Sequence, residues 1–347
     1  MPNDKTVLPP DCQADFIGEG AANVVFHVRL PRGGPAFPGY LLRVPKAGTS
    51  AFSYEELQEY WEKTVAPLFE DGRLLVKQSL ISLKGSGIVP KLNATLAEVG
   101  ATRRQDFQGS RVADVECGML VQDMRGRDAH DLVLEFKPKW LSQSPAAPPD
   151  ATRCRNCARE AYRANKDGKT LGSTGRAPLC PLKLVHLRET ACDHEQAGHK
   201  GQENPDCEIC ATAAALLLRS RHSADQSHIA PYKARLAHWI RRNELLPLLR
   251  RLQVACDAGL ESDRELNMTM RDCTCFVRMS SKPGTPVDAR LGDLDRKNGA
   301  AKRAYWEEME RKLAEGGYYE GKEVPRQRTT CWLERGLKTQ ERREAME

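Results

Sequence analysis

The first third of the chain alternates apolar and polar residues in short segments, which is the pattern of half-buried β-strands. One segment lies within residues 17–30, where a glycine-rich turn precedes the β-prone run 24–28, and a second is Tyr40-Leu41-Leu42-Arg43-Val44. Between them, Pro31 to Gly39 is rich in proline and glycine. The pattern therefore predicts an antiparallel hairpin in this region.

A change of period follows the hairpin and predicts a helix. Ser53 and Glu56 have the spacing of a capping box, and Leu57, Trp61 and Leu68 recur at helical intervals behind them. A further strand is predicted at residues 117–121, just before Gln122-Asp123-Met124. We place a domain boundary there, which gives an N-terminal lobe of residues 1–124 and a C-terminal lobe of residues 125–347.

The second half of the chain contains segments with the strand period and segments with the helix period, and it is predicted to be more helical than the first half. Strands are predicted at residues 132–136 and 268–279, and helices at residues 232–253, interrupted near Pro247, and at 300–314. The tail beyond Glu320 is highly charged, so we expect it to be frayed or a solvated helix. The sum of these segments predicts an α+β fold with a small β-rich N-terminal lobe and a larger mixed C-terminal lobe.

Composition removes several classes of protein. The 347 residues are 40% hydrophobic, enough for a sizeable core, and no apolar run reaches the roughly 18 residues of a membrane span. The formal charge of 53 − 47 = +6 is mild and does not by itself indicate a nucleic-acid partner. The first residues show no signal-peptide pattern and no long heptad occurs, so we expect a soluble, intracellular monomer.

The glycine-rich turn is the first motif with chemical meaning. Gly18-Glu19-Gly20-Ala21-Ala22-Asn23 is followed by β-branched residues, which favours a strand–turn–strand lid over nucleotide phosphates rather than a dinucleotide-binding turn. Such a lid needs a cation on the next strand, and Arg43 has that place. The alternative readings are an ordinary hairpin turn and an exposed strand arginine.

A second motif, Lys137-Pro138-Lys139, ends the strand predicted at residues 132–136. On an extended segment the two lysines point the same way, with a proline stiffening the backbone between them. Like charges fixed side by side are unfavourable unless a polyanion neutralises them. The pair therefore favours a phosphate-dense ligand, and the alternative is a solvated strand end.

Two aspartates near the end of the chain complete the pattern. Asp272 lies in a β-like stretch and Asp293 just beyond it. Phosphoryl transfer needs one carboxylate to position or deprotonate the attacking hydroxyl and another to hold magnesium. The cations and the tyrosine that could bind phosphate at the next helix start are Lys297, Lys302, Arg303 and Tyr305. The alternatives are turn aspartates and a solvated helix face.

Taken together, these motifs resemble the inositol pentakisphosphate 2-kinases, in their fungal form. They lie in that family's order and span nearly the whole chain. The matching stretches are Gly18-Glu19-Gly20-Ala21-Ala22-Asn23, Leu42-Arg43-Val44, Glu135-Phe136-Lys137-Pro138-Lys139, Cys180-Pro181-Leu182, Arg271-Asp272-Cys273, and Asp293-Leu294-Asp295 with Lys297 and Tyr305.

The resemblance implies a two-lobed fold distantly like protein kinases. It implies transfer of the ATP γ-phosphate to the 2-hydroxyl of inositol 1,3,4,5,6-pentakisphosphate, giving inositol hexakisphosphate (phytate), with Mg²⁺ as cofactor and a nuclear or cytoplasmic location. Asp272 would act on the hydroxyl, Asp293 would hold Mg²⁺, and Lys137 would be a third catalytic residue. The remaining roles implied are ATP binding by Gly18, Gly20, Ala21, Ala22, Asn23 and Arg43, adenine contact by Gln122, Asp123 and Met124, and substrate-phosphate binding by Lys137, Lys139, Lys297 and Tyr305.

The sequence departs from the family in two respects. Where the family often has an arginine four residues after Lys297, this chain has Ala301, and Lys302 or Arg303 could substitute. Other substrate-binding arginines cannot be assigned by sequence. One role is open among Arg103, Arg104 and Arg111, and another among Arg153, Arg155, Arg159, Arg163 and Lys166.

The twelve cysteines include two pairs with zinc-knuckle spacing, Cys154-x-x-Cys157 and Cys207-x-x-Cys210. His199, Cys207, Cys210 and His222 have an order similar to that of a structural zinc site in some members of the family. They would form a zinc-stapled insertion at residues 190–225, with Cys192 and His194 as rival ligands. The alternatives are reduced pairs without metal, and Cys154 and Cys157 that only pack.

Two other functions compete with the 2-kinase. A kinase of a less phosphorylated inositol or another polyol would leave Lys137 and Lys139 without neutralising phosphates. A non-enzymatic zinc module that binds RNA or a polyphosphate lacks interleaved aromatic and basic residues, because aromatics are only 6% of the chain.

Overall fold

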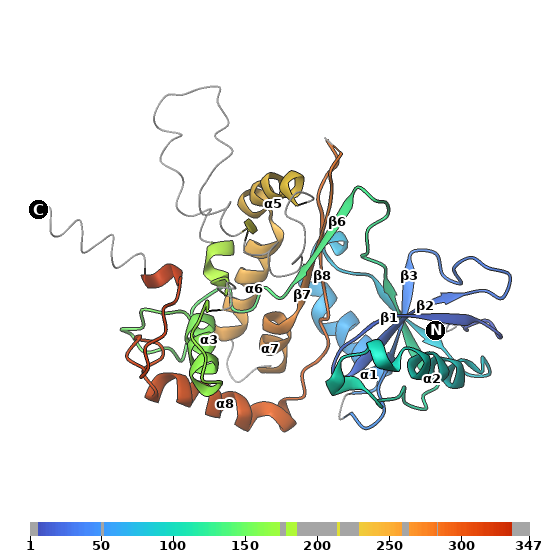
Figure 1. The fold of residues 1–347 in the computed structure, drawn as a ribbon, viewed down its shortest axis with the longest axis horizontal. Coiled ribbons are helices and arrows are strands. Elements are labelled where there is room, and N and C mark those ends of the chain that lie inside the picture. Colours follow the sequence, from blue (N-terminus) through green and yellow to red (C-terminus); the bar gives the residue numbers. More distant parts are fainter. Residues whose placement is uncertain are drawn as a thin grey trace, which may run out of the picture. The chain divides into compact units, whose positions relative to one another are not determined.

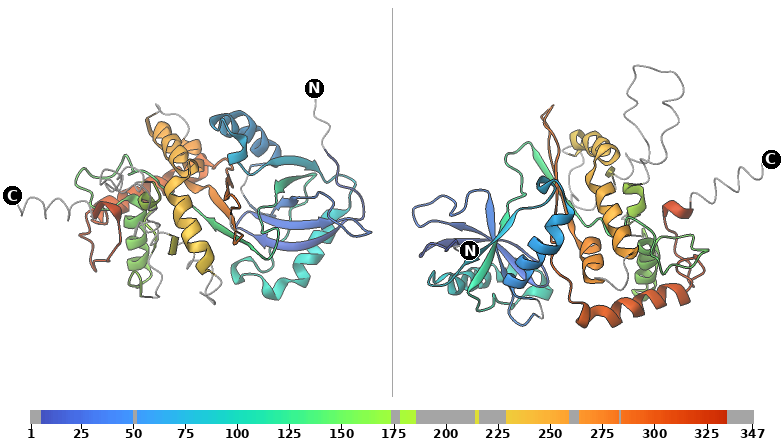
Figure 2. Two further views of the ribbon diagram at one scale, coloured as in Figure 1. Left: turned by 90° about the horizontal axis from the view of Figure 1, so that it is seen from above. Right: turned by 180° about the vertical axis from the view of Figure 1, so that it is seen from behind.

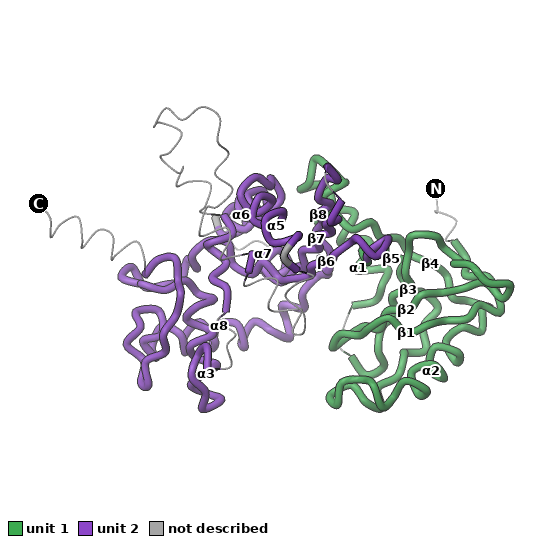
Figure 3. Tube along the Cα trace, turned by 45° about the horizontal axis from the view of Figure 1, so that its top comes forward, with its two compact units in different colours: residues 1–125 green, residues 126–347 purple. Residues whose placement is uncertain are grey.

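The structure is a computed structural model that describes residues 6–49, 52–173, 178–185, 214–215, 229–258, 264–282 and 284–334. The chain divides into two compact units, which we call unit 1 (Met1–Arg125) and unit 2 (Gly126–Glu347) (Figure 3). Each unit is described by itself below.

Unit 1 is built on a five-stranded antiparallel sheet with strand order β1-β2-β3-β5-β4 (Figure 1). The hairpin predicted from residues 17–44 is confirmed as β2 and β3, and β1 precedes the glycine-rich turn as a further strand. The strands are β1 Gln13–Glu19, β2 Asn23–Arg29, β3 Tyr40–Pro45, β4 Gln78–Ser82 and β5 Cys117–Gln122.

The helix predicted from the capping box is also confirmed. The Ser53 hydroxyl accepts from the Glu56 amide at 3.2 Å, and the Glu56 carboxylate accepts from the Ser53 amide at 2.8 Å. Helix α1 (Tyr54–Tyr60) begins at this box and continues as one π-helical and one 3₁₀ turn to Leu68. The second helix of the unit is α2 (Ile88–Glu98).

The two helices cover opposite faces of the sheet. Met119 and Leu120 are consecutive in β5, so their side chains point to opposite sides. Met119 packs in a cluster with Tyr54 of α1, whereas Leu120 belongs to the main core with Leu92 of α2. Figure 2 shows α1 and α2 on the two sides of the strands. Both faces are thus sealed by apolar contacts, which fixes the strand carrying Arg43.

Unit 2 combines a three-stranded antiparallel sheet, order β6-β7-β8, with helices (Figure 1). Helix α5 contacts β7, α6 packs on α7, and α3 packs on α8. The elements are β6 Asp131–Phe136, α3 Arg155–Lys166, α5 Ala230–Arg242, α6 Leu245–Ala258, α7 Arg264–Asp272, β7 Thr274–Ser280, β8 Asp288–Gly292 and α8 Gly299–Glu315. The α+β class expected from the sequence is confirmed.

Two predicted elements of unit 2 differ from the structure. The strand predicted at residues 268–279 is wrong in its first half, because α7 runs to Asp272 and β7 begins only at Thr274. The helix predicted to break near Pro247 breaks earlier, where the Asn243 side chain accepts from the Leu246 amide at 2.8 Å. Pro247 lies in the first turn of α6, where its missing amide costs no helical hydrogen bond.

The expectation of a frayed or solvated tail is wrong for residues 321–334. Tyr319, Glu323, Gln327 and Cys331 are buried, and the Arg153 guanidinium pairs with Glu323 at 2.8 Å. Some of the charges that suggested a solvated segment are therefore buried inside unit 2. Their burial is tolerated because they are paired with opposite charges. Within the described residues, no helix is long and apolar enough to cross a bilayer.

Candidate functional site

Three lysines converge on two aspartates in unit 2, and we call these five residues the lysine–aspartate cluster. Lys137 Nζ lies 3.2 Å from Asp272 Oδ1 and 3.0 Å from Asp293 Oδ2. Lys139 Nζ lies 3.0 Å from the same Asp272 oxygen, and Lys297 Nζ lies 3.3 Å from Asp272 Oδ2. The structure thus brings together five of the residues singled out by sequence, from segments separated by up to 160 positions.

The local structure explains how these side chains meet. Lys137 and Lys139 follow β6 directly, Asp272 is the last residue of α7, and Asp293 follows β8. Lys137 Nζ also donates to the Asp272 carbonyl oxygen at 2.6 Å, so it satisfies one of the open carbonyls at the end of α7. A carboxylate at the negative end of a helix is unfavourable, and the three ammonium groups offset that cost.

Two members of the cluster have a strained backbone. The φ angles of Lys139 and Asp293 are 59° and 55°, in the left-handed region that non-glycine residues rarely adopt. The sequence predicted an extended Lys-Pro-Lys segment, and this prediction is wrong at Lys139. Both lysines nevertheless reach the same Asp272 oxygen. Strain of this kind costs on the order of 1–3 kcal/mol per residue and gathers at functional sites.

The cluster strongly perturbs its own titration. Burial alone would raise the pKa of Asp272, but the charges of Lys297, Lys139 and Lys137 outweigh it and hold that pKa well below its usual range. Burial would lower the pKa of Lys137, and the two aspartates raise it instead. Burial is the main cause that lowers the pKa of Lys139. Asp272 raises this pKa, but the positive charges of Lys137 and Arg159 lower it further. Asp272 is thus a persistent anion.

Arg159 on α3 extends the positive region toward Tyr305. Its guanidinium lies 3.5 Å from the Tyr305 hydroxyl, and this contact lowers the pKa of the tyrosine. Among the residues that the structure describes, no carboxylate lies within 4 Å of Arg159. Its charge also acts on Lys139, so Arg159 belongs electrostatically to the lysine–aspartate cluster.

The other arginines that sequence reasoning could not rank have different surroundings. Arg153 is fully buried between Glu323 and Glu334. Arg155 is buried, pairs with Glu310 at 2.7 Å and stacks on Trp140. Arg163 pairs with Glu160 at the surface. The sequence signal that could have selected Arg159 is absent, because only the fold shows which basic residues already have carboxylate partners.

In unit 1, the glycine-rich turn is anchored by a buried acid. Glu19 accepts two bonds of 2.7 Å from Arg103 and pairs with Lys46 at 2.7 Å. The Arg103 hydrogen bond, aided by Lys46 and opposed by burial, lowers the pKa of Glu19. The side chains of Arg103 and Lys46 are 2% and 3% exposed, which gives both a structural role. Arg104, by contrast, is exposed and pairs with Asp106.

The anchor makes a prediction about acid stability. Glu19→Gln should lower the free energy of unfolding of unit 1 by about 2 kcal/mol at neutral pH, because Arg103 and Lys46 lose a charged acceptor. A lowered folded-state pKa contributes stability above the unfolded pKa, and that contribution is lost as pH falls through the folded pKa.

Denaturant titrations at several pH values measure this effect. The variant should show a flatter acid limb than the wild-type chain. Glu116→Gln is the control, since Glu116 and Lys84 are both 74% exposed and 3.5 Å apart. Parallel pH profiles for Glu19→Gln and the wild-type chain would contradict the assignment.

The glycines of the turn are not explained by the fold of unit 1. A Cβ atom at Gly18 or Gly20 would have no heavy atom within 4 Å, and neither residue has a positive φ. Gly118 in β5 is the opposite case, because a Cβ there would lie 2.8 Å from Leu42 Cδ1. Internal packing therefore requires glycine at position 118 but not at positions 18 and 20.

Arg43 lies beside this turn. With the Asn23 amide oriented to satisfy both its ends, its oxygen accepts from Arg43 Nη2 at 2.5 Å and its nitrogen donates to the Tyr54 hydroxyl at 2.8 Å. Arg43 also lies over the Tyr54 ring, 5.6 Å from its centroid, and is 8% exposed. The arginine and the turn expected to act together are thus neighbours, with Ala21 and Ala22 between the strands.

The three residues predicted near adenine, Gln122 to Met124, lie close to the end of unit 1. The amide of Gln122 donates to the Lys77 carbonyl at 2.8 Å, and that of Asp123 donates to the Gly39 carbonyl at 2.8 Å. The Asp123 carboxylate pairs with Arg125 at 2.7 Å, and Met124 is buried. These contacts order the segment that precedes Gly126, where unit 2 begins.

Some predicted site residues are not brought into the cluster. Lys302 is exposed on α8, and no ion pair of its side chain occurs with a described residue. The proposed zinc ligands His199, Cys207, Cys210 and His222, and their rivals Cys192 and His194, lie outside the described residues.

Comparison with known proteins decides the family. A model of the family described as inositol-pentakisphosphate 2-kinase matches residues 16–262 and 261–312. The chain belongs to the inositol-pentakisphosphate 2-kinase family. It is also 29% identical over 196 residues to an inositol-pentakisphosphate 2-kinase of Yarrowia lipolytica, an alignment that spans 54% of this chain and 53% of that relative.

Membership of the family covers both parts of the candidate site. The matched ranges of this 2-kinase family member include the glycine-rich turn, Arg43 and all five residues of the lysine–aspartate cluster. The chain spans about half the length of the curated relative that it matches. The resemblance that rested on short motifs is therefore confirmed at the level of the family.

Proposed function

We propose that this chain transfers the γ-phosphate of ATP to the 2-hydroxyl of inositol 1,3,4,5,6-pentakisphosphate and so forms inositol hexakisphosphate. The observation that carries the proposal is the convergence of Lys137, Lys139 and Lys297 on Asp272 and Asp293. A polyanionic acceptor requires several cations, and phosphoryl transfer requires carboxylates beside them. Family membership supports a kinase over the non-enzymatic alternative.

Asp272 would position the acceptor hydroxyl. In the step proposed, the hydroxyl oxygen forms a bond to the γ-phosphorus, the bond from that phosphorus to the bridging oxygen of ADP breaks, and the hydroxyl proton is released to solvent after the new bond has begun to form. The depressed pKa of Asp272 makes it a weak proton acceptor, so its main contribution is a hydrogen bond that aligns the hydroxyl. A loose transition state demands little more from a base.

Lys137 would neutralise charge between the two aspartates. Its ammonium group contacts both Asp272 and Asp293, so it lies where an acceptor and a transferring phosphoryl group would have to meet. Lys139, Lys297 and Tyr305 would bind substrate phosphates, and Arg159 would join them from α3. The ion pairs with Asp272 would then be exchanged for pairs with phosphate oxygens.

The donor set at Asp293 fits Mg²⁺. The ion takes hard oxygen ligands and usually keeps several waters beside one or two carboxylates. The Asp293 side chain is 40% exposed, which leaves room for water and phosphate oxygens. When bound, Mg²⁺ would neutralise charge on the nucleotide phosphates.

Unit 1 would bind the nucleotide. Gly18 and Gly20 would allow backbone amides close to the phosphates, Arg43 would contact a phosphate, and Gln122 to Met124 would contact adenine. What supports this assignment is the turn between β1 and β2, the open space beside both glycines and the buried cation beside Asn23.

The decisive assay incubates the purified chain with Mg²⁺, ATP and inositol 1,3,4,5,6-pentakisphosphate and separates the products by anion exchange. A hexakisphosphate peak that requires ATP supports the proposal. A pentakisphosphate isomer already phosphorylated on the 2-position should not react, which tests the acceptor hydroxyl. Unphosphorylated inositol tests whether the cations require a polyanion. Product from the folded chain with inositol but not with the pentakisphosphate would overturn the proposal.

The nucleotide assignment predicts opposite outcomes at two glycines. Gly20→Ala should raise the KM for ATP by roughly ten- to a hundredfold, because a methyl group would hold the phosphates off the turn. Its free energy of unfolding should change by less than about 1 kcal/mol, since the Cβ meets no atom.

Gly118→Ala is the matched control, because its Cβ would clash with Leu42 inside the core. This control should lower the free energy of unfolding and leave the KM for ATP of the remaining folded chain unchanged. Steady-state kinetics and denaturant titration measure both quantities. An unchanged KM for ATP in Gly20→Ala would argue against a phosphate-binding turn.

A further inference from the structure

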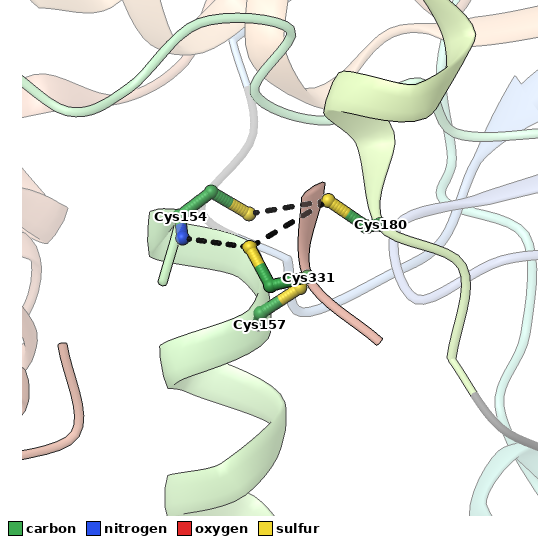
Figure 4. Close-up of side chains that lie close together, drawn as sticks. All are labelled: Cys154, Cys157, Cys180 and Cys331. Carbon is green, nitrogen blue, oxygen red and sulfur yellow. Dashed lines mark hydrogen bonds between the residues drawn. The ribbon is translucent and has the colours of Figure 1, made fainter. Parts of the chain in front are cut away.

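Four cysteines from three distant segments of unit 2 point their sulfur atoms toward one another (Figure 4). Cys154 precedes α3 and Cys157 lies in its first turn. Cys180 precedes the 3₁₀ turn Pro181–Leu184, and Cys331 lies in the segment that follows α8. We call these four residues the cysteine cluster.

The spacing of the sulfur atoms matches one tetrahedral metal ion. All four Sγ atoms lie within 4.8 Å of one another. Cys180 Sγ lies 3.7 Å from Cys154 Sγ and 3.9 Å from Cys331 Sγ. Zinc bound by four thiolates at about 2.3 Å places neighbouring sulfurs about 3.8 Å apart. A disulfide would need about 2.05 Å, and all four cysteines are free.

The surroundings of the cysteine cluster suit thiolates that bind a structural ion. The four residues are 0–5% exposed. The Cys154 amide donates to Cys331 Sγ at 3.2 Å, and the Trp332 amide donates to Cys180 Sγ at 3.5 Å. Amide donors to metal-bound sulfur are the expected second layer of such a site. Leu182, Trp332 and Leu333 pack around the cluster and exclude water.

We propose that Cys154, Cys157, Cys180 and Cys331 bind one structural zinc ion. Four thiolates fill the tetrahedral coordination of zinc and leave no position open for a substrate, so the ion would be structural rather than catalytic. Thiolates also select zinc over the hard cations Mg²⁺ and Ca²⁺. This site is separate from the lysine–aspartate cluster and shares no ligand with the set His199, Cys207, Cys210 and His222.

The zinc would join three segments that are far apart in the sequence. It would hold the beginning of α3, the turn at Pro181 and the segment around Cys331 together. The same end of α3 carries Arg155, and one turn further lies Arg159. If the proposed kinase function holds, the zinc would therefore fix the helix that presents Arg159 to the substrate, but zinc binding itself does not depend on that function.

Metal analysis of the full chain tests the proposal, with purification that avoids metal-affinity resin. The variant Cys154→Ser with Cys157→Ser should lose one zinc ion per chain relative to the wild-type chain. The matched control is Cys207→Ser with Cys210→Ser, which changes the other C-x-x-C pair and should retain that zinc. Equal zinc in the wild-type chain and the first variant would overturn the proposal.

A variant that fails to fold would also lose zinc, so two further measurements use chains that keep the fold. Wild-type chain reconstituted with Co²⁺ should show the visible absorption of tetrahedral thiolate-bound cobalt, and Cys331→His should shift that absorption while retaining metal, because zinc accepts three cysteines and one histidine. Intact mass under non-reducing conditions should correspond to free thiols. Disulfides within the cysteine cluster, bound iron in place of zinc, or a wild-type chain without metal would each overturn the proposal.

Discussion

Replacing Asp272 with asparagine is expected to lower kcat for pentakisphosphate phosphorylation by roughly a hundredfold, because the acceptor hydroxyl loses its alignment. The amide keeps the size of the side chain but can no longer accept a strong, charge-assisted hydrogen bond from the 2-hydroxyl. The affinity for the pentakisphosphate should stay the same or increase. In the free chain Asp272 contacts all three lysines of the cluster, so it competes with substrate phosphates for the same ammonium groups.

This split between kcat and affinity separates a catalytic role from a structural one. If Asp272 only held the three lysines in place, its loss would weaken substrate binding and kcat together. Lys139→Met is the matched comparison, since it removes one cation from the same carboxylate and should raise the KM for the pentakisphosphate.

Steady-state kinetics and calorimetric titration of the pentakisphosphate measure the two effects. Asp128→Asn serves as the control, because Asp128 pairs with Lys282 at the surface and is not part of the cluster. A normal kcat in Asp272→Asn, or a parallel loss of kcat and affinity, would remove the aspartate from the proposed mechanism.

The residues of the lysine–aspartate cluster could be predicted because each has a local signature. A repeated lysine around a proline is rare enough to demand a reason, Asp272 and Asp293 follow the glycine-rich turn in the order expected of phosphoryl transfer, and Lys297 precedes a predicted helix. What the sequence could not show is the pairing in detail. Lys137 reaches both aspartates, and the left-handed backbone of Lys139 sets the direction of its side chain, a property of the folded loop rather than of the residue type.

The strand prediction for residues 268–279 failed at its first half for a tertiary reason. Met268 and Met270 would share one face of a strand but lie on different faces of a helix, and so short an apolar run does not by itself distinguish the two periods. The packing of α7 on α6 stabilises the helical conformation of this segment. As a result Asp272 lies at a helix end, where three lysines offset an unfavourable dipole, and not within a strand.

The cysteine cluster shows where local reading stops. Cys154 and Cys157 have a recognisable spacing, and Cys180 belongs to a family motif, but Cys331 lies about 150 residues from Cys180 with no pattern around it. Only the return of the chain after α8 brings it to the other three. The same return makes Arg153 a buried residue, which is why sequence could not separate it from Arg159.

Arg153→Met is expected to lower the free energy of unfolding of unit 2 by about 3–5 kcal/mol. The Arg153 side chain is fully buried, pairs with Glu323 and Glu334 at 2.8 and 2.9 Å, and donates to the Gln327 carbonyl at 2.7 Å. Methionine fills part of the volume but leaves the buried Glu323 carboxylate without its main partner. Most of the cost is therefore the desolvation of that charge.

The second substitution Glu323→Gln, made in the Arg153→Met chain, should recover part of the lost stability, because it removes the uncompensated charge. Arg163→Met is the surface control, since Arg163 and Glu160 form an exposed pair worth roughly 0–1 kcal/mol. Urea titrations of the four chains at one pH measure these differences. A double variant less stable than Arg153→Met would show that most of the lost stability comes from packing. The segment after α8 would then be held to the beginning of α3 by packing and not by ion pairs.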